Sequence, residues 1–332
     1  MHSKTLKIAS LLLASTLFGC PKEAPKEAGG DGKTKSAAGA ESIRIAVIPK
    51  GTSHSFWKGM EAGAKAAGRE EKVEIIWQGP DKENDITSQV NLVQDQANKN
   101  VQGVVLAATD ATALVAPIKG LKAKGIPVVT VDSGVKEDVA ECYIATDNVK
   151  GGQLAAQELA KAIGDKGKVA MLLFLKGAVS NDEREKGFVD ELKKHPGIKL
   201  VSTQEGNSAA DALDKTTNMF TANPDIVGIF AASEPNGVGA ANYIRQNKLV
   251  GKVKLVAYDT SPEEVSALDE GVIQSLIVQN PYEMGYQGVK VVLNAIRKKP
   301  VDKKFIDSGV VVVTKANEKL PEIQKLLTVP KE

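Results

Sequence analysis

Polar side chains that could bind a small molecule follow several apolar segments of this sequence. Four β-branched segments end in this way: residues 128–131 before Asp132 and Ser133, 226–230 before Ser233 and Glu234, 255–258 before Asp259, and 273–278 before Gln279 and Asn280. Any one of these polar residues could equally cap a helix or form a turn. Their recurrence in both halves of the chain points instead to ligand binding at the carboxyl ends of strands.

Residues that could catalyse a reaction or bind a metal are not arranged for either task. The stretch from Gly51 to Ser55 is no nucleophile elbow, because Ser55 replaces the last glycine of that motif. Gly237-Val238-Gly239 lacks the third glycine of a dinucleotide fingerprint. His54 and His195 lie far apart, with no cysteine or acid at ligand spacing. We therefore expect no catalytic residue, no metal site and no cofactor.

The first twenty residues have the pattern of an export signal. Lys4 and Lys7 form a basic region, and residues 8–18 form an apolar run too short to span a bilayer stably. Gly19 before Cys20 resembles a bacterial lipobox, which implies cleavage of residues 1–19 and attachment of a diacylglycerol to the Cys20 sulfur. An ordinary signal peptide with an incidental cysteine is the alternative.

The composition after Cys20 predicts a flexible linker and a neutral mature protein. Residues 20–42 are rich in Pro, Lys, Glu, Ala, Gly and Ser and contain no large apolar residue. The 332-residue chain has 43 basic and 41 acidic side chains, and loss of Lys4 and Lys7 would make the counts equal. This balance argues against a nucleic-acid partner. We expect membrane contact through the lipid anchor alone, and we expect Cys142, left without a disulfide mate, to be a buried thiol.

From residue 43 onward, short β-branched segments alternate with helical ones, which predicts an α/β fold of doubly wound parallel sheets. The first half has expected strands at 43–48, 73–77, 103–107 and 128–131, and helices at 55–69, 85–98 and 113–124. The second half has expected strands at 169–174, 200–203, 226–230, 255–258 and 273–278, and helices at 182–194, 209–222, 235–247 and 262–269. A helix at 281–297 and strands near Phe305 and at 310–314 could complete either sheet.

Several motifs between residues 43 and 314 point to one family. They are Ser55-Phe56-Trp57, residues 126–132, Ala145 to Asn148 with Gly151-Gly152, Glu183-Arg184 before Gly187-Phe188, Tyr258-Asp259, and Gln279 before Pro281. In these the chain resembles the periplasmic sugar-binding proteins of ABC importers related to ribose-binding protein, which share their fold with the ligand domains of LacI-type repressors. The resemblance implies a type I periplasmic binding protein, with two lobes joined by a hinge of three crossings. The first lobe would comprise 43–146 plus 280–308, and the second 147–279 plus 309–328.

The resemblance also implies a ligand site. Phe56 and Trp57 would pack on a sugar ring, while Asp132, Arg184, Asp259 and Gln279 would bind its hydroxyl groups. Aromatic faces suit the C–H faces of a sugar, and carboxylates and guanidinium groups form strong charge-assisted hydrogen bonds with hydroxyls. From the sequence alone, the aromatic pair could instead pack in a helix core, and Arg184 could lie on a solvated face of residues 182–186.

Other positions differ from the ribose binders, and these set the expected ligand. His54, Ala107 and Ser233 stand where those proteins carry asparagine, Ser133 stands where they carry arginine, and their second-lobe phenylalanine falls near Ser208. Fewer contacts fit a furanose, and short side chains at Ala107, Ser133 and Ser233 are expected to widen the pocket. We therefore expect a hexose or a polyol, with His54, Ser133 and Ser233 among the ligand-binding residues.

Lys50 supports an alternative within the same class. The segments around Lys50 and at residues 78–80 resemble those of the receptor for the furanosyl signal autoinducer-2. In that receptor, a lysine and an aspartate aligned with Lys50 and Asp132 hold the ligand. A structural lipoprotein that has lost binding is a third possibility. The main prediction is capture of a monosaccharide or polyol by hinge closure and delivery to the transmembrane subunits of an ABC permease, in the periplasm or at the cell surface. A chemoreceptor is a further candidate partner.

Overall fold

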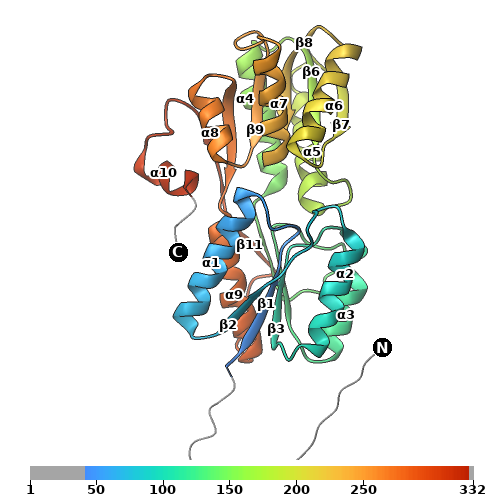
Figure 1. The fold of residues 1–332 in the computed structure, drawn as a ribbon, viewed down its shortest axis with the longest axis vertical. Helices are drawn as coiled ribbons and strands as arrows, with labels where there is room; N and C mark the ends of the chain where they lie inside the picture. The colour runs from blue at the N-terminus through green and yellow to red at the C-terminus, as the bar shows by residue number, and fades with distance from the viewer. Residues whose placement is uncertain (1–41, 329–332) are drawn as a thin grey trace, which may run out of the picture. The chain divides into compact units, whose positions relative to one another are not determined.

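In the computed structural model, residues 42–328 are described, so the predicted signal peptide, Cys20 and nearly all of the linker lie outside them. Within this range, two six-stranded sheets carry helices on both faces (Figure 1). This arrangement confirms the predicted α/β fold with two doubly wound, mainly parallel sheets. No helix of residues 42–328 is long and apolar enough to cross a membrane.

The first sheet has the strand order β11-β5-β4-β3-β1-β2, and all its neighbouring strands are parallel. Its strands are β1 (Arg44–Ile48), β2 (Glu74–Trp77), β3 (Gly103–Leu106), β4 (Val128–Val131), β5 (Tyr143–Ala145) and β11 (Phe305–Asp307). Helices α1 (Ser55–Glu71) and α9 (Pro281–Ile296) cover one face, and α2 (Ile86–Asp95) and α3 (Val115–Ala123) cover the other (Figure 1). A short 3₁₀ helix, Gln96–Asn98, follows α2.

The second sheet has the order β12-β10-β9-β8-β6-β7, and only its edge strand β12 runs antiparallel to its neighbour. Its strands are β6 (Gly167–Leu173), β7 (Ile198–Glu205), β8 (Ile226–Ala231), β9 (Lys254–Tyr258), β10 (Ile273–Gln279) and β12 (Val310–Val313). Its helices are α4 (Asn148–Ile163), α5 (Val179–Leu192), α6 (Ala209–Ala222), α7 (Glu234–Gln246) and α8 (Pro262–Asp269), followed near the end of the chain by α10 (Pro321–Leu327). The chain passes between the sheets at residues 146–148, 279–281 and 308–309. The lobe boundaries given above stay a prediction.

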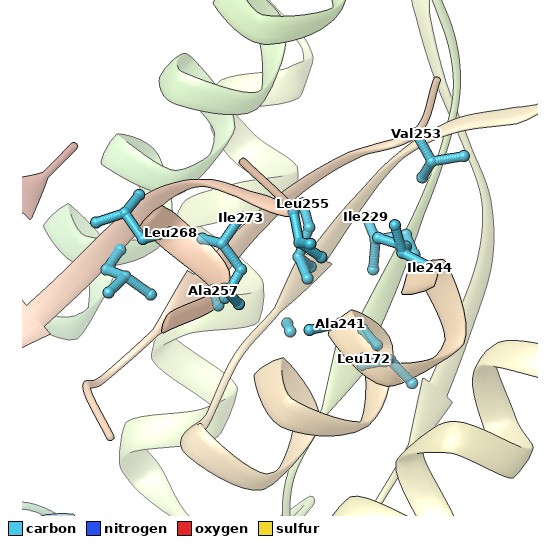
Figure 2. Close-up of a cluster of buried hydrophobic side chains, with 14 of the residues drawn as sticks. Leu172, Ile229, Ala241, Ile244, Val253, Leu255, Ala257, Leu268 and Ile273 are labelled. Carbon is cyan, nitrogen blue, oxygen red and sulfur yellow. The ribbon is translucent and has the colours of Figure 1, made fainter. Parts of the chain in front are cut away.

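Apolar side chains on both faces of each sheet form the core. Figure 2 shows one such layer, where Leu172, Ile229 and Leu255 from the strands meet Ala241 and Ile244 from α7 and Leu268 from α8. Strands buried on both faces need continuous apolar sequence, which explains why β-branched runs located them correctly. Cys142 is buried as expected, and burial raises the pKa of its thiol.

Three elements, β5, α4 and α10, were not predicted from the sequence. The buried stripe of α4 consists mainly of small residues, among them Gly151, Gly152, Ala155 and Ala156, so its hydrophobic periodicity is weak. Its ends are nevertheless well defined, because Asp147 accepts a hydrogen bond from Lys150 N and Gly164 takes a left-handed conformation.

Small residues let two helix pairs approach closely. A Cβ on Gly285 of α9 would lie 2.1 Å from the carbonyl oxygen of Met60, and one on Gly63 of α1 would lie 1.9 Å from that of Tyr282. The α4–α5 pair has the same construction, since a Cβ on Gly152 would lie 2.2 Å from the carbonyl oxygen of Arg184. Backbone contact at these points fixes where the first turns of α1 and α5 lie.

We expect Gly285→Ala to lower the free energy of unfolding by about 1–3 kcal/mol, because the new methyl group must push α1 and α9 apart. Gly120→Ala is the matched control: Gly120 lies in α3 with nothing within 4 Å of an added Cβ. There the same substitution should stabilise the helix by roughly 0.5–1 kcal/mol. Urea denaturation measures both, and equal effects of the two substitutions would contradict this account of the packing.

Candidate functional site

A pocket lies between the carboxyl ends of strands from both sheets. It encloses about 430 Å³, including open solvent at its mouth. The lining residues are Lys50, His54, Phe56, Trp57, Glu83, Asp132, Phe174, Ala178, Ser180, Asn181, Arg184, Ser233, Glu234, Pro235, Asp259 and Gln279. Nine of the ten predicted ligand-binding residues are therefore brought together, although they span more than two hundred positions in the sequence.

The two aspartates occupy corresponding positions in the two sheets. Asp132 follows β4 and Asp259 follows β9, and both have left-handed backbone conformations, with φ of 57° and 78°. This region is unfavourable for most residues and is tolerated by aspartate and asparagine. At each aspartate the chain turns away from the strand, and the carboxylate lies at the pocket wall.

Asp132 forms a buried ion pair with Lys50. Lys50 Nζ lies 2.8 Å from Asp132 Oδ2, and it also donates to Ser180 Oγ at 3.1 Å. Lys50 and Asp132 are 5% and 3% exposed, so the pair is almost fully desolvated and each charge depends on the other. Lys50, from the end of β1, is thus the ion-pair partner of Asp132 in the described part of the chain.

Asp259 is held by hydrogen bonds from an amide and a backbone N–H. Gln279 Nε2 donates to its Oδ1 at 2.5 Å, and Glu234 N donates to its Oδ2 at 3.1 Å. Burial raises the pKa of Asp259, while the charge of Arg184 and these hydrogen bonds oppose that rise. Asp259 is thus a fixed acceptor at the pocket wall.

Arg184 is buried rather than part of a solvated helix face. Its Nε donates to Asn148 Oδ1 at 2.9 Å and its Nη1 donates to Ala232 O at 2.8 Å, while its Cζ lies 3.8 Å from the centre of the Tyr258 ring. Burial alone would lower the pKa of Arg184, but the charges of Tyr258, Asp259 and Asp132 raise it. The guanidinium is therefore charged and held in one plane.

The aromatic wall lies at the first turn of α1. The rings of Phe56 and Trp57 are perpendicular, with centroids 4.8 Å apart, and they are 8% and 3% exposed. Both rings also belong to the core of the first sheet, so the pair lines the pocket and packs in the core at the same time. Trp57 Nε1 donates to Glu83 Oε1 at 2.7 Å, and His54 Nδ1 lies 2.6 Å from the same oxygen.

Glu234 connects the two sheets across the pocket. The backbone N–H groups of Ser55 and Phe56, at the start of α1, donate to its two carboxylate oxygens at 3.2 Å each. Glu234 itself belongs to α7, beside the second sheet. His54, at the N-cap of α1, forms no side-chain cap, so a carboxylate from the other sheet satisfies these helix N–H groups.

Several buried polar atoms at the pocket have no hydrogen-bond partner among the described residues. They are Asn181 Nδ2, Ser233 Oγ and Gln279 Oε1. An unsatisfied buried polar group is costly, and a ligand rich in hydroxyl groups could satisfy such atoms. No group of three or more His, Cys, Asp or Glu residues within 42–328 could hold a metal ion.

Not every expectation about individual positions holds. Ser133 is fully buried behind the wall, where Ser180 N donates to its Oγ at 3.3 Å, and Ala107 is fully buried in the core. Of the three short side chains expected to widen the pocket, only Ser233 lines it. Ser208 caps α6 and does not line the pocket, whereas Phe174, just after β6, does.

Glu83, Asn181 and Glu234 also line the pocket and were not among the ligand-binding residues predicted from the sequence. Glu83 lies in a loop before α2, and Asn181 uses its Oδ1 to accept a hydrogen bond from Phe174 N. Phe174 and Glu234 each follow a strand closely, and this position was the one signal that could have identified them.

Comparison with known proteins places the chain in a family. Residues 45–300 match the model of the periplasmic binding protein domain. This protein belongs to the periplasmic binding protein family. The family consists of solute-binding proteins of ABC importers, which are not enzymes.

Relatives of this periplasmic binding protein bind sugars. The D-allose-binding periplasmic protein of Escherichia coli (strain K12) is 30% identical over 291 residues, which cover 83% of this chain and 93% of that protein. A carbohydrate transporter solute-binding protein from Agrobacterium radiobacter, solved with D-arabinose, has a TM-score of 0.84 and 33% identity and covers 87% of this chain and 99% of its own. An ABC transporter solute-binding protein from Agrobacterium vitis, solved with α-D-tagatopyranose, has a TM-score of 0.83 and 35% identity and covers 87% and 100%.

The stability contributed by His54 should depend on pH. Burial alone would lower the pKa of His54, but its hydrogen bond with Glu83 and the charges of Glu83, Glu234 and Asp259 raise it above the usual 6.5. The folded state therefore favours the protonated imidazole, and this contribution is complete below pH 6.5 and is lost as the pH rises through the higher folded-state pKa. His54→Gln should thus lower the melting temperature more at pH 6 than at pH 9, as measured by circular dichroism.

Glu83→Gln removes the charge that raises the pKa, so in that background His54→Gln should show little dependence on pH. A His54→Gln effect that grows toward pH 9 would refute this assignment.

Proposed function

We propose that this protein captures a monosaccharide or polyol, preferably a hexose, and delivers it to an ABC permease. One observation carries the proposal: an aromatic wall at α1 faces buried carboxylate, amide and guanidinium groups within one pocket. Sugars need both surfaces, because their C–H faces are apolar and their hydroxyl groups require partners once they leave water. The ligands of its relatives, D-allose, D-arabinose and α-D-tagatopyranose, support a monosaccharide.

Capture would occur by hinge closure, with the two sheets and their helices acting as the two lobes. The proposal is supported by contacts that join the sheets at the pocket, from Glu234 to the start of α1 and from Lys50 to Ser180. A ligand that touches both walls favours the closed state by its additional contacts there. The three connections at residues 146–148, 279–281 and 308–309 would form the hinge.

A furanosyl signal related to autoinducer-2 is a second candidate ligand. Lys50 and Asp132, the residues aligned with that receptor's site, both line the pocket and pair at 2.8 Å. Such a ligand would have to compete with this ion pair or bridge it. A hexose could instead use the carboxylate and ammonium groups as they stand.

A thermal-shift panel tests the proposed ligand class. Hexoses and polyols should raise the melting temperature more than ribose does, because a ligand that binds only the folded state stabilises it by mass action. Ribose as the strongest stabiliser would contradict the preference for a hexose. No shift with any sugar or polyol would favour a structural lipoprotein.

With the best sugar from that panel, Asp259→Asn should weaken binding by roughly 10- to 100-fold, since a charged acceptor fixed by Gln279 is replaced by a neutral amide. Isothermal titration calorimetry measures the change. Asp225→Asn is the control, because Asp225 pairs with Lys168 on the surface, away from the pocket. Equal affinities of the two variants would remove Asp259 from the site.

We also propose that Cys20 carries a lipid that tethers the mature protein to a membrane. A tether raises the effective concentration of the receptor at its permease when the linker can reach. In the native host, Cys20→Ser should move the protein from the membrane fraction to the soluble fraction and leave its sugar-induced thermal shift unchanged. Membrane association that survives this substitution in high salt would contradict lipid anchoring.

A further inference from the structure

A second surface, at the opposite end of the first sheet, is rich in lysine. It is an open groove formed by segments that precede β3, β4 and β5 and by the chain after α9. Five lysines line it, Lys122, Lys124, Lys298, Lys299 and Lys304, together with one carboxylate, Glu141. We call this surface the lysine groove.

Much of its positive charge is not neutralised within the described part of the chain. Two of the lysines form ion pairs: Lys122 Nζ lies 3.2 Å from Glu141 Oε1, and Lys304 Nζ lies 3.1 Å from Asp138 Oδ1. Lys124, Lys298 and Lys299 are exposed and form no ion pair with another residue of 42–328.

Helix dipoles do not account for this cluster. The carboxyl ends of α3 and α9 point to the groove, and a cation stabilises such an end. That effect acts only within the last turn of each helix, where α3 has Lys122 and α9 has no basic residue. Lys124 is the C-cap residue of α3, whereas Lys298, Lys299 and Lys304 lie beyond the last turn of α9, so helix ends do not account for the whole cluster.

The linker joins the fold at the edge of this groove. Arg44, the first residue of β1, donates from its backbone N to Gln102 Oε1 at 2.7 Å, and Gln102 N donates back to Arg44 O at 2.9 Å. Gln102 is part of the groove wall. A random-coil chain of the length between Cys20 and Ser42 would have a mean end-to-end distance of about 25 Å. With Cys20 in a membrane, a chain of that length would keep the start of the described fold, and with it the groove, near the lipid surface.

We propose that the lysine groove binds the anionic phosphate headgroups of the membrane to which Cys20 is tethered, a second membrane contact besides the anchor expected from the sequence. The orienting role rests on the proposed lipid anchor, whereas the affinity for headgroups does not. Flexible ammonium groups donate to phosphate oxygens from many directions, which suits a fluid surface of anionic lipid. Each lysine held near such a surface contributes roughly a fivefold gain in binding. The contact turns a tether of variable direction into a preferred orientation.

The test uses the mature chain with Cys20→Ser, which carries no acyl group. Sedimentation with vesicles should show binding to an equal mixture of phosphatidylglycerol and phosphatidylcholine at low ionic strength. Binding should be lost with phosphatidylcholine alone and at high salt, where charges are screened. The triple variant Lys124→Gln/Lys298→Gln/Lys299→Gln should bind at least about tenfold more weakly.

A matched control removes the same charge elsewhere. Lys166, Lys199 and Lys252 are exposed lysines of the second-sheet half, and their triple change to glutamine should leave vesicle binding nearly unchanged. Equal losses in the two triple variants, or equal binding to neutral vesicles, would overturn the proposal. Absence of any vesicle binding would also overturn it and would favour an acidic protein surface as the partner. Sugar-induced thermal shifts of all variants report separately on the proposed function.

Discussion

The structure depends on the pairing of charges that are buried where the two sheets meet. Lys50, Asp132, Arg184 and Asp259 are each less than a tenth exposed, and a buried charge without a partner would cost several kcal/mol. Burial removes the water that would otherwise solvate these four charges, so protein groups must replace it. Lys50 and Asp132 satisfy each other, whereas Asp259 and Arg184 rely on backbone groups, amides and the Tyr258 ring. This requirement constrains where the strand ends and the first turns of α1, α5 and α7 can lie.

Helix packing provides that placement at a distance from the pocket. Gly63 and Gly285 bring α1 and α9 into backbone contact, and Gly152 and Gly187 do so for α4 and α5. The first turn of α1 carries Phe56 and Trp57, and the first turns of α5 carry Ser180, Asn181 and Arg184. A small displacement of either helix would separate side chains that now meet at hydrogen-bond distance. Glycine on a helix face thus contributes to the site without touching it.

The sequence allowed most of the strands to be located, because a strand buried on both faces must be continuously apolar. It also identified Asp132, Asp259 and Gln279, since polar residues directly after such strands stand out from their surroundings. It did not identify α4, whose buried face is largely glycine and alanine, or Glu83, which lies in a loop without a pattern. It also could not assign partners: that Lys50 rather than Arg184 pairs with Asp132, and that Ser133 lies behind the wall, depends on side-chain directions at corners with positive φ.

The polarity of a parallel sheet places the pocket and the lysine groove at opposite ends of the first sheet. All strands of the first sheet point the same way, so the loops at their carboxyl ends form the pocket while those at their amino ends form the lysine groove. Strands of four or five residues hold the two sites roughly 15 Å apart. In the buried pocket, positive and negative side chains occur together, because a charge away from water must be compensated. At the exposed groove an excess of positive charge is tolerated, because water solvates it. The proposed membrane contact at the amino ends of these strands would leave the pocket at their carboxyl ends accessible to a ligand.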